Sequence, residues 1–116
     1  MSNPTDDLYA VADFCLIPIG THDPSVAEYI AECHRVLQKS GLTFKMHGYG
    51  TNIEGPWSKV CQAIHDCHAA VHSKGAPRVA TDVRIGTRVD REIAAGEGNE
   101  HKLKRVEEIL TKGAPS

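Results

Sequence analysis

The sequence contains neither a long apolar run nor an excess of basic residues. No stretch approaches the roughly 20 apolar residues that cross a bilayer, and Met1 to Asp7 is polar, without the apolar core of a signal peptide. Thirteen Lys and Arg residues against fifteen Asp and Glu residues give a net charge of -2, whereas binding to a phosphate backbone needs a basic excess. We therefore expect a cytoplasmic protein that contacts neither membranes nor nucleic acid.

Signatures of catalysis are also missing. The chain has no G-x-S-x-G nucleophile elbow, and Gly48-x-Gly50 is too short for a phosphate loop and lacks the Lys-Ser/Thr that would follow it. The four cysteines form no C-x-x-C pair, so we interpret them as reduced, mostly packed thiols. We expect no enzymatic activity, no catalytic residue and no cofactor.

The composition that is present suits one small domain. The chain has 116 residues, of which 41% are hydrophobic and 24% charged, close to the averages of globular proteins. Both ends are poor in apolar residues. We expect a disordered N-terminus over 1–7, a single domain over 8–110 and a flexible tail over 111–116.

Hydrophobic periodicity predicts four strands and three helices. Leu8 to Ile19 is apolar at nearly every position, which indicates a strand covered on both faces, and Pro18, which cannot donate to a ladder, marks where its pairing loosens. Arg78 to Asp90 alternates strictly and predicts another strand. The remaining elements are a helix capped by Asp23, begun by Pro24 and ended at Ser40-Gly41, strands over 42–49 and 51–54, a helix from Gly55-Pro56 to Lys74-Gly75, and a final helix after Gly96 and Gly98.

The order β-α-β-β-α-β-α predicts an α+β fold of the split β-α-β kind with one added helix. Helices in such a fold cover one face of the sheet, yet the first strand is apolar on both sides, so we expect a second copy to cover the outer face. Packing sheet against sheet would create a cleft between subunits, lined by charged residues of the last strand.

The segment from His47 to Trp57 is the densest group of potential ligand contacts. Its glycines let the backbone approach a ligand closely, and an acceptor beside an aromatic ring suits a flat heterocycle with an amine on its edge. The alternative is structural: the glycines shape a turn, Thr51 and Glu54 satisfy backbone donors at the next helix, and Trp57 packs in the core.

Charged residues alternate in sign along the last predicted strand. Asp82, Arg84, Arg88 and Asp90 follow one another at two-residue steps on one face. They can form a ladder of ion pairs, within the sheet or between subunits, or present a site for an anion and an amine.

A stripe of Cys and His on the second predicted helix resembles a row of metal ligands. Cys61, His65, His68 and His72 follow the helical spacing. One straight helix offers only two neighbouring ligands to an ion, and the others would have to come from His34 or His47. A metal-responsive protein is therefore an alternative, against a stripe of amphipathic or pH-sensitive side chains; we assign no metal ligand.

Three separated motifs resemble the thiamine-binding-protein domain family: Leu16-Ile-Pro-Ile-Gly-Thr21, Gly50-Thr-Asn-Ile-Glu-Gly-Pro-Trp57 and Thr81-Asp-Val-Arg-Ile-Gly-Thr-Arg-Val-Asp90. The resemblance covers about residues 8–110. It implies a ferredoxin-like fold, a homodimer or homotetramer that pairs through its sheets, and binding of thiamine or its pyrimidine moiety. An enzyme of thiamine-related metabolism is a further alternative.

The resemblance places the pocket segment at Thr51, Asn52, Glu54 and Trp57, and an interface near Arg84, Arg88 and Asp90. Our hypothesis is that the aminopyrimidine stacks on Trp57 or Tyr49, that Glu54 or Asp82 accepts from its amine, and that a carboxylate offsets the thiazolium charge. The expected ligand-binding residues are His47, Tyr49, Thr51, Asn52, Glu54, Trp57, Asp82 and Arg84.

Overall fold

The computed structural model describes residues 7–22 and 26–113. Its elements are, in chain order, β1 (Tyr9–Ile19), α1 (Ala27–Ser40), β2 (Thr43–His47), β3 (Gly50–Pro56), α2 (Trp57–Ser73), β4 (Arg78–Gly86) and α3 (Gly98–Gly113). The predicted order of strands and helices is confirmed, and with it the α+β class. No helix among the described residues is long and apolar enough to cross a membrane.

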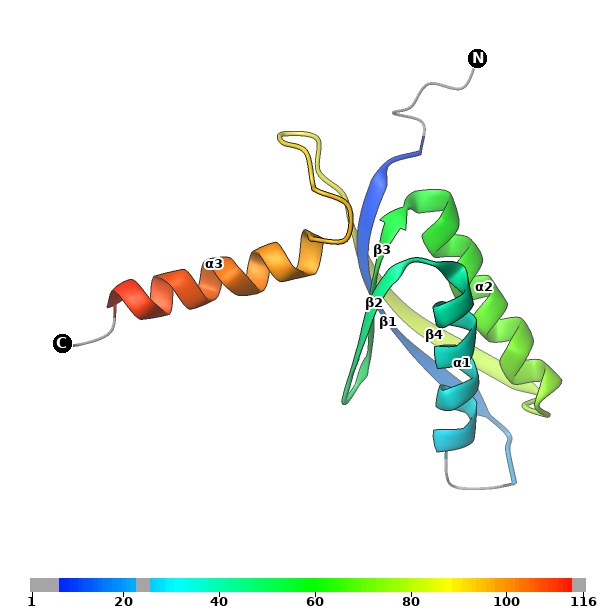
Figure 1. Ribbon diagram of the computed structural model, residues 1–116. Helices are drawn as coiled ribbons and strands as arrows, with labels where there is room; N and C mark the ends of the chain where they lie inside the picture. The colour runs from blue at the N-terminus through cyan, green and yellow to red at the C-terminus, as the bar shows by residue number, and fades with distance from the viewer. Residues whose placement is uncertain (1–6, 23–25, 114–116) are drawn as a thin grey trace, which may run out of the picture.

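The strands form one antiparallel sheet in the order β2-β3-β1-β4. The helices α1 and α2 pack side by side on one face of it, which we call the inner face (Figure 1). The central strand β1 pairs with β3 along Tyr9–Phe14 and with β4 along Val11–Ile19. One side of β1 is therefore paired only over its first half.

The core lies between the inner face and the two helices. Every second residue of β1 points into it, because successive side chains of a strand alternate between faces. The main buried contributors are Ala10, Ala12, Phe14 and Leu16 from β1, Ile53 from β3, Cys33 and Leu37 from α1, and Val60, Ala63, Cys67 and Val71 from α2. All four cysteines are free thiols, and two of them, Cys33 and Cys67, are buried.

The last strand is shorter than its alternating pattern predicted. β4 ends at Gly86 and does not reach Asp90. Alternation shows which face a residue would take, but a strand also needs a partner. After Gly86 the chain leaves the sheet and comes back over β1, where the Gly96 N–H donates to the Tyr9 hydroxyl at 2.7 Å. Arg88 and Asp90 therefore lie outside the sheet.

Three other boundaries differ from the prediction. β3 continues through Pro56, so that Gly55-Pro56 ends a strand and α2 begins at Trp57. The predicted cap at Asp23 and Pro24 lies outside the described residues, and α1 begins at Ala27. α3 extends to Gly113, so it includes part of the segment 111–116 that was expected to be a tail.

The helix α3 leads away from the sheet and the other two helices (Figure 1). Its apolar side chains, Leu103, Val106, Ile109 and Leu110, are all exposed. The outer face of the sheet also carries an exposed apolar residue, Ile17 of β1. Covering of that face by a second copy stays a prediction.

Candidate functional site

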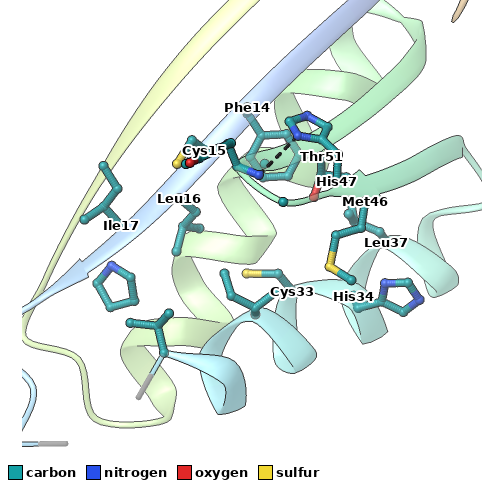
Figure 2. Close-up of a pocket in the computed structure, with 16 residues that line it drawn as sticks. Phe14, Cys15, Leu16, Ile17, Cys33, His34, Leu37, Met46, His47 and Thr51 are labelled. Atoms are coloured by element: carbon teal, nitrogen blue, oxygen red, sulfur yellow. Dashed lines mark hydrogen bonds between the residues drawn. The ribbon is translucent and has the colours of Figure 1, made fainter. Parts of the chain in front are cut away.

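A pocket opens where β1 continues past the end of β3. It lies between α1, the second half of β1 and the turn that joins β2 to β3, and its volume is about 370 Å³ (Figure 2). Of the predicted ligand-binding residues, His47, Tyr49 and Thr51 line it. Its other walls are Phe14, Cys15, Leu16, Ile17 and Pro18 from β1, Val26 at the start of α1, Ile30, Cys33, His34 and Leu37 from α1, and Met46, Gly48 and Gly50 from the hairpin.

The pocket exists because the β2–β3 hairpin is short. The last pair between β1 and β3 joins Phe14 to Thr51, and the turn follows at Gly48 and Tyr49. Gly50 must be small here, since a Cβ at this position would lie 2.6 Å from the Phe14 carbonyl oxygen. The close approach fixes the hairpin against β1 and leaves the rest of the strand to form a pocket wall.

The interior of the pocket is largely apolar. Phe14, Leu16 and Leu37 are core residues that reach its floor. The ring of His34 meets the ring of Phe44 edge to face, with centroids 5.0 Å apart. Met46, half exposed, adds a flexible thioether at the opening. Such a lining suits a flat, mostly apolar ligand.

Polar groups gather at the rim on the hairpin side. His47 Nε2 lies 2.6 Å from Asp13 Oδ1, and the Tyr49 N–H donates to His47 Nδ1 at 3.3 Å. Because Nδ1 accepts, the proton of a neutral His47 ring is on Nε2, which donates to Asp13. The ring of Tyr49 is 90% exposed beside this pair. This side of the pocket thus presents one oriented imidazole and one unpacked aromatic ring, while the Asp13 carboxylate holds the imidazole from the outer face of the sheet.

Glu54 lies elsewhere and has a different set of contacts. It is buried, and its carboxylate accepts hydrogen bonds from the Tyr9 hydroxyl at 2.7 Å, the Gly98 N–H at 2.6 Å and the Asn99 N–H at 3.0 Å. Gly98 and Asn99 begin α3, so the carboxylate satisfies the free donors of that helix. This matches the structural alternative for Glu54, except that the helix is α3 and not the next one along the chain.

Three more predicted residues lie on the outer face of the sheet. The register pairs Asp13 of β1 with Asn52 on one side and with Arg84 on the other, and pairs Cys15 with Asp82. Since Phe14 and Leu16 point inward, these neighbours point outward. Asn52, Asp82 and Arg84 therefore do not join the pocket wall, although Asp13 connects their face to His47 at the rim.

Trp57 is at the opposite end of β1 from the pocket. It is the first residue of α2, its N–H donates to the Leu8 carbonyl, and its side chain is exposed. Among the predicted aromatic contacts, only Tyr49 belongs to the pocket.

Arg88 and Asp90 form an exposed ion pair after β4. The Arg88 guanidinium donates to both carboxylate oxygens, at 2.6 and 2.5 Å, and these bonds lower the pKa of Asp90 to about 2. Both residues border a second hollow of about 470 Å³ beside the start of α3. Their predicted role at an interface stays a prediction.

The three histidines of the Cys and His stripe of α2 make separate contacts, and Cys61 is an exposed free thiol. His68 Nε2 lies 2.6 Å from Thr81 Oγ1, His72 Nδ1 lies 2.8 Å from the Ala76 carbonyl, and His65 contacts Asp66. Burial, and then the neighbouring histidines His72 and His65, lower the pKa of His68. Over residues 7–22 and 26–113, no group of three His, Cys, Asp or Glu side chains could hold a metal ion.

Sequence reasoning missed the β1 wall and the carboxylate that holds His47. Asp13 interrupts an otherwise apolar strand, which is a usable signal. Pro18 is another, because it fits a strand only where no N–H is required. The contributions of His34 and Met46 depend on how α1 packs beside the hairpin, which no local pattern shows.

The fold and this pocket define a class of small α+β proteins with a four-stranded antiparallel sheet, two helices on its inner face and a third helix leading away. The sequence model of the Thiamine-binding protein family matches residues 12–107, and the chain belongs to this family.

Relatives with similar sequences include proteins of the UPF0045 family. The chain is 46% identical to the UPF0045 protein sll0230 of Synechocystis over 100 residues, covering 86% of this chain and 78% of that protein. It is 39% identical to the UPF0045 protein ECM15 of Eremothecium gossypii over 104 residues, covering 90% and 95%.

Solved structures agree on the fold. The hypothetical protein MJ1052 of Methanocaldococcus jannascii is 29% identical, with a TM-score of 0.74 over 86% of this chain and 97% of that one. The putative thiamine biosynthesis/salvage protein TM0486 of Thermotoga maritima is 12% identical, with a TM-score of 0.64 over 80% of this chain and 98% of that one. The second likeness concerns the fold alone.

Proposed function

We propose that the protein binds thiamine, or the aminopyrimidine part of it, in the pocket beside the β2–β3 hairpin. The observation that carries the proposal is that the hairpin residues expected to contact a ligand, His47, Tyr49 and Thr51, form one wall of an apolar pocket in a chain of the Thiamine-binding protein family. A volume of about 370 Å³ is within the usual range for small-ligand sites, about 300–1,000 Å³.

The chemistry of the lining suits the two halves of this ligand. The pyrimidine ring is flat and apolar on its faces, so it fits between the inner wall of Leu16 and Cys33 and the ring of Tyr49. The thiazolium ring carries a positive charge, and at the rim it would meet the Asp13 carboxylate and the face of Tyr49. Glu54, which already accepts three hydrogen bonds, is not needed for this arrangement.

Calorimetric titration with thiamine tests the proposal. We expect saturable binding that Tyr49→Ala weakens by about tenfold, the loss of one aromatic stacking contact, and that Tyr49→Phe retains. Trp57→Phe is a matched aromatic control at the far end of β1 and should bind as the parent does. No heat of binding, or equal loss in Tyr49→Ala and Trp57→Phe, would contradict the proposed site.

Binding without turnover is part of the proposal. Thiamine incubated with the protein and then separated from it should be recovered unchanged by chromatography. A product that forms in proportion to protein concentration would instead support the alternative of an enzyme acting on a thiamine-related metabolite.

We also propose that the protein assembles into a homodimer or homotetramer in the cytoplasm. The exposed apolar residue Ile17 on the outer face and the exposed apolar side chains of α3 support assembly. The Arg88–Asp90 pair lies beside the start of α3, where it borders a hollow that a second copy could fill. Sedimentation velocity at micromolar concentration is the test, and a monomer throughout would contradict it.

A further inference from the structure

The unpaired half of β1 presents backbone groups to the pocket. In an antiparallel sheet the N–H and C=O of one residue point to the same neighbouring strand, and those of the next residue point to the opposite one. Three contacts show which residues of β1 point their backbone groups toward β3 and which toward β4. The Leu8 carbonyl accepts from Trp57 on the β3 side, the Phe14 carbonyl approaches Gly50 on that side, and the Val11 carbonyl approaches Gly86 on the β4 side.

The alternation assigns even-numbered residues of β1 to the β3 side. Beyond Phe14 these are Leu16 and Pro18, while Cys15 and Ile17 point toward Asp82 and Ala80 of β4. No strand among the described residues pairs with β1 beyond Phe14 on the β3 side. Pro18 has no N–H to leave unpaired. Leu16 is therefore the residue that offers both a donor and an acceptor along this edge, and it lines the pocket.

The backbone N–H and C=O of one extended residue are complementary to the hydrogen-bonding groups on one edge of an aminopyrimidine. Such a ring carries an exocyclic amine, which donates, next to a ring nitrogen, which accepts. The Leu16 carbonyl can accept from the amine while the Leu16 N–H donates to the ring nitrogen, as a neighbouring strand would in a sheet. The ring then lies in the plane of the sheet, with the apolar inner wall on one face and the hairpin turn near the other.

We propose that the backbone of Leu16 is the specificity-determining contact, which selects heterocycles that carry an amine beside a ring nitrogen. This inference rests on the proposed binding site in the hairpin pocket. It assigns recognition of the amine to the main chain and not to the Glu54 or Asp82 side chains, which lie on the outer side of the sheet. A backbone contact of this kind is insensitive to the side chain at position 16.

Selectivity for the amine follows from the pattern of donors and acceptors. Replacing the 4-amino group of thiamine by an oxo group puts an acceptor opposite the Leu16 carbonyl and a ring N–H opposite the Leu16 N–H. Both hydrogen bonds are then lost and like groups face each other. We expect the oxo analogue to bind at least tenfold more weakly than thiamine in calorimetry.

Amide hydrogen exchange followed by nuclear magnetic resonance tests the contact directly on the full chain. Without ligand, the Leu16 amide should exchange faster than the amides of Cys15 and Ile17, which pair with β4. With saturating thiamine, the Leu16 amide should become protected by at least tenfold, while the two neighbours change little.

The outcomes separate this inference from the proposed function. Saturable thiamine binding that leaves Leu16 exchange unchanged would overturn the backbone contact and keep the site. Thiamine and its oxo analogue could also bind with equal affinity to Thr51→Val or to Asp82→Asn. That result would assign recognition of the amine to the substituted side chain and would overturn the backbone contact. No binding of thiamine or of 4-amino-5-hydroxymethyl-2-methylpyrimidine would overturn both proposals.

Discussion

Glu54 shows how a single buried carboxylate can hold two distant parts of a chain together. It lies on β3, yet three of its hydrogen bonds come from Tyr9 and from the first two residues of α3. Its negative charge stands at the positive end of that helix. The family motif singles out Glu54, but the contacts assign it to attaching α3.

Glu54→Gln should therefore destabilise the fold. One acceptor becomes an amide NH₂ that faces backbone donors, and the helix loses its charged partner. We expect a loss of about 1–3 kcal/mol in the free energy of unfolding, measured by urea denaturation with circular dichroism. The control is Glu107→Gln on the exposed part of α3, which should stay within about 0.5 kcal/mol. Equal midpoints for both variants would contradict the role of Glu54.

Tyr9 makes the same cluster sensitive to alkaline pH. Burial, and then the hydrogen bond to the Glu54 carboxylate, raise the pKa of Tyr9 to about 12, whereas tyrosine in an unfolded chain ionises near about 10. The folded state therefore holds the proton more tightly. Its contribution to stability is complete below pH 10 and is lost as the pH rises toward 12.

A spectrophotometric titration should find a late ionisation step that belongs to Tyr9, and Tyr9→Phe should remove that step. Over the same interval the free energy of unfolding should fall more steeply in the parent than in Tyr9→Phe. Tyr49→Phe, which removes an exposed ring hydroxyl, is the control and should leave the late step in place. A late step that persists in Tyr9→Phe would refute the assignment.

At the scale of elements, the start of α3 depends on close contact with the sheet. A Cβ added to Gly98 would lie 2.5 Å from Val11 Cγ2 and 3.0 Å from Glu54 Oε1. At the other end of the same helix, Gly113 has open space around it. The two glycines form a matched pair in which only the first has a packing requirement.

Gly98→Ala should displace the start of α3 and cost about 1–3 kcal/mol of stability, as overpacking does. Gly113→Ala should be neutral or slightly stabilising, because alanine is the better helix former. Thermal unfolding by circular dichroism gives the comparison, and limited proteolysis shows whether α3 has become accessible. Equal results for Gly98→Ala and Gly113→Ala in both measurements would contradict the packing requirement at Gly98.

The elements were more predictable than their ends and their distant contacts. Apolar residues at helical or alternating spacing predict the helices and two of the strands, because burial of one face imposes these periods. The strand over 8–19 followed from a nearly continuous apolar run, and the strand over 51–54 from the glycines before it. The rule of alternation predicted that β4 extends to Asp90, whereas the strand ends at Gly86, because the alternation of residue types continues after pairing with β1 stops. Within the candidate site, His47, Tyr49 and Thr51 are neighbours in sequence and were found together. Asn52, next to Thr51, faces the outer side of the sheet, where His47 also contacts Asp13.

At the scale of the whole molecule, the chain leaves two surfaces without partners among its described residues. One is the outer face of the sheet around Ile17, away from the end that the start of α3 covers at Glu54. The other is the apolar side of α3, where Leu103, Val106 and Leu110 follow the helical spacing. An amphipathic helix that leads away from its own core gains stability chiefly by packing against another surface.

Val106→Glu should therefore weaken self-association by about tenfold or more, since it would bury a charge in the expected interface. Lys104→Glu, at an exposed polar position of the same helix, is the matched control and should keep the association state. Sedimentation velocity over a range of concentrations measures both. Identical profiles for the parent and Val106→Glu would place the interface away from α3.

The central claim is that the ligand binds on the hairpin side of β1 and not on the outer face of the sheet. Mapping of backbone amide shifts during titration with thiamine tests it most directly. The account predicts saturable shifts concentrated in residues 15–18 and 47–51, with little change at Asp82 and Arg84 of β4. Shifts concentrated at Asn52, Asp82 and Arg84, with residues 15–18 unaffected, would contradict it.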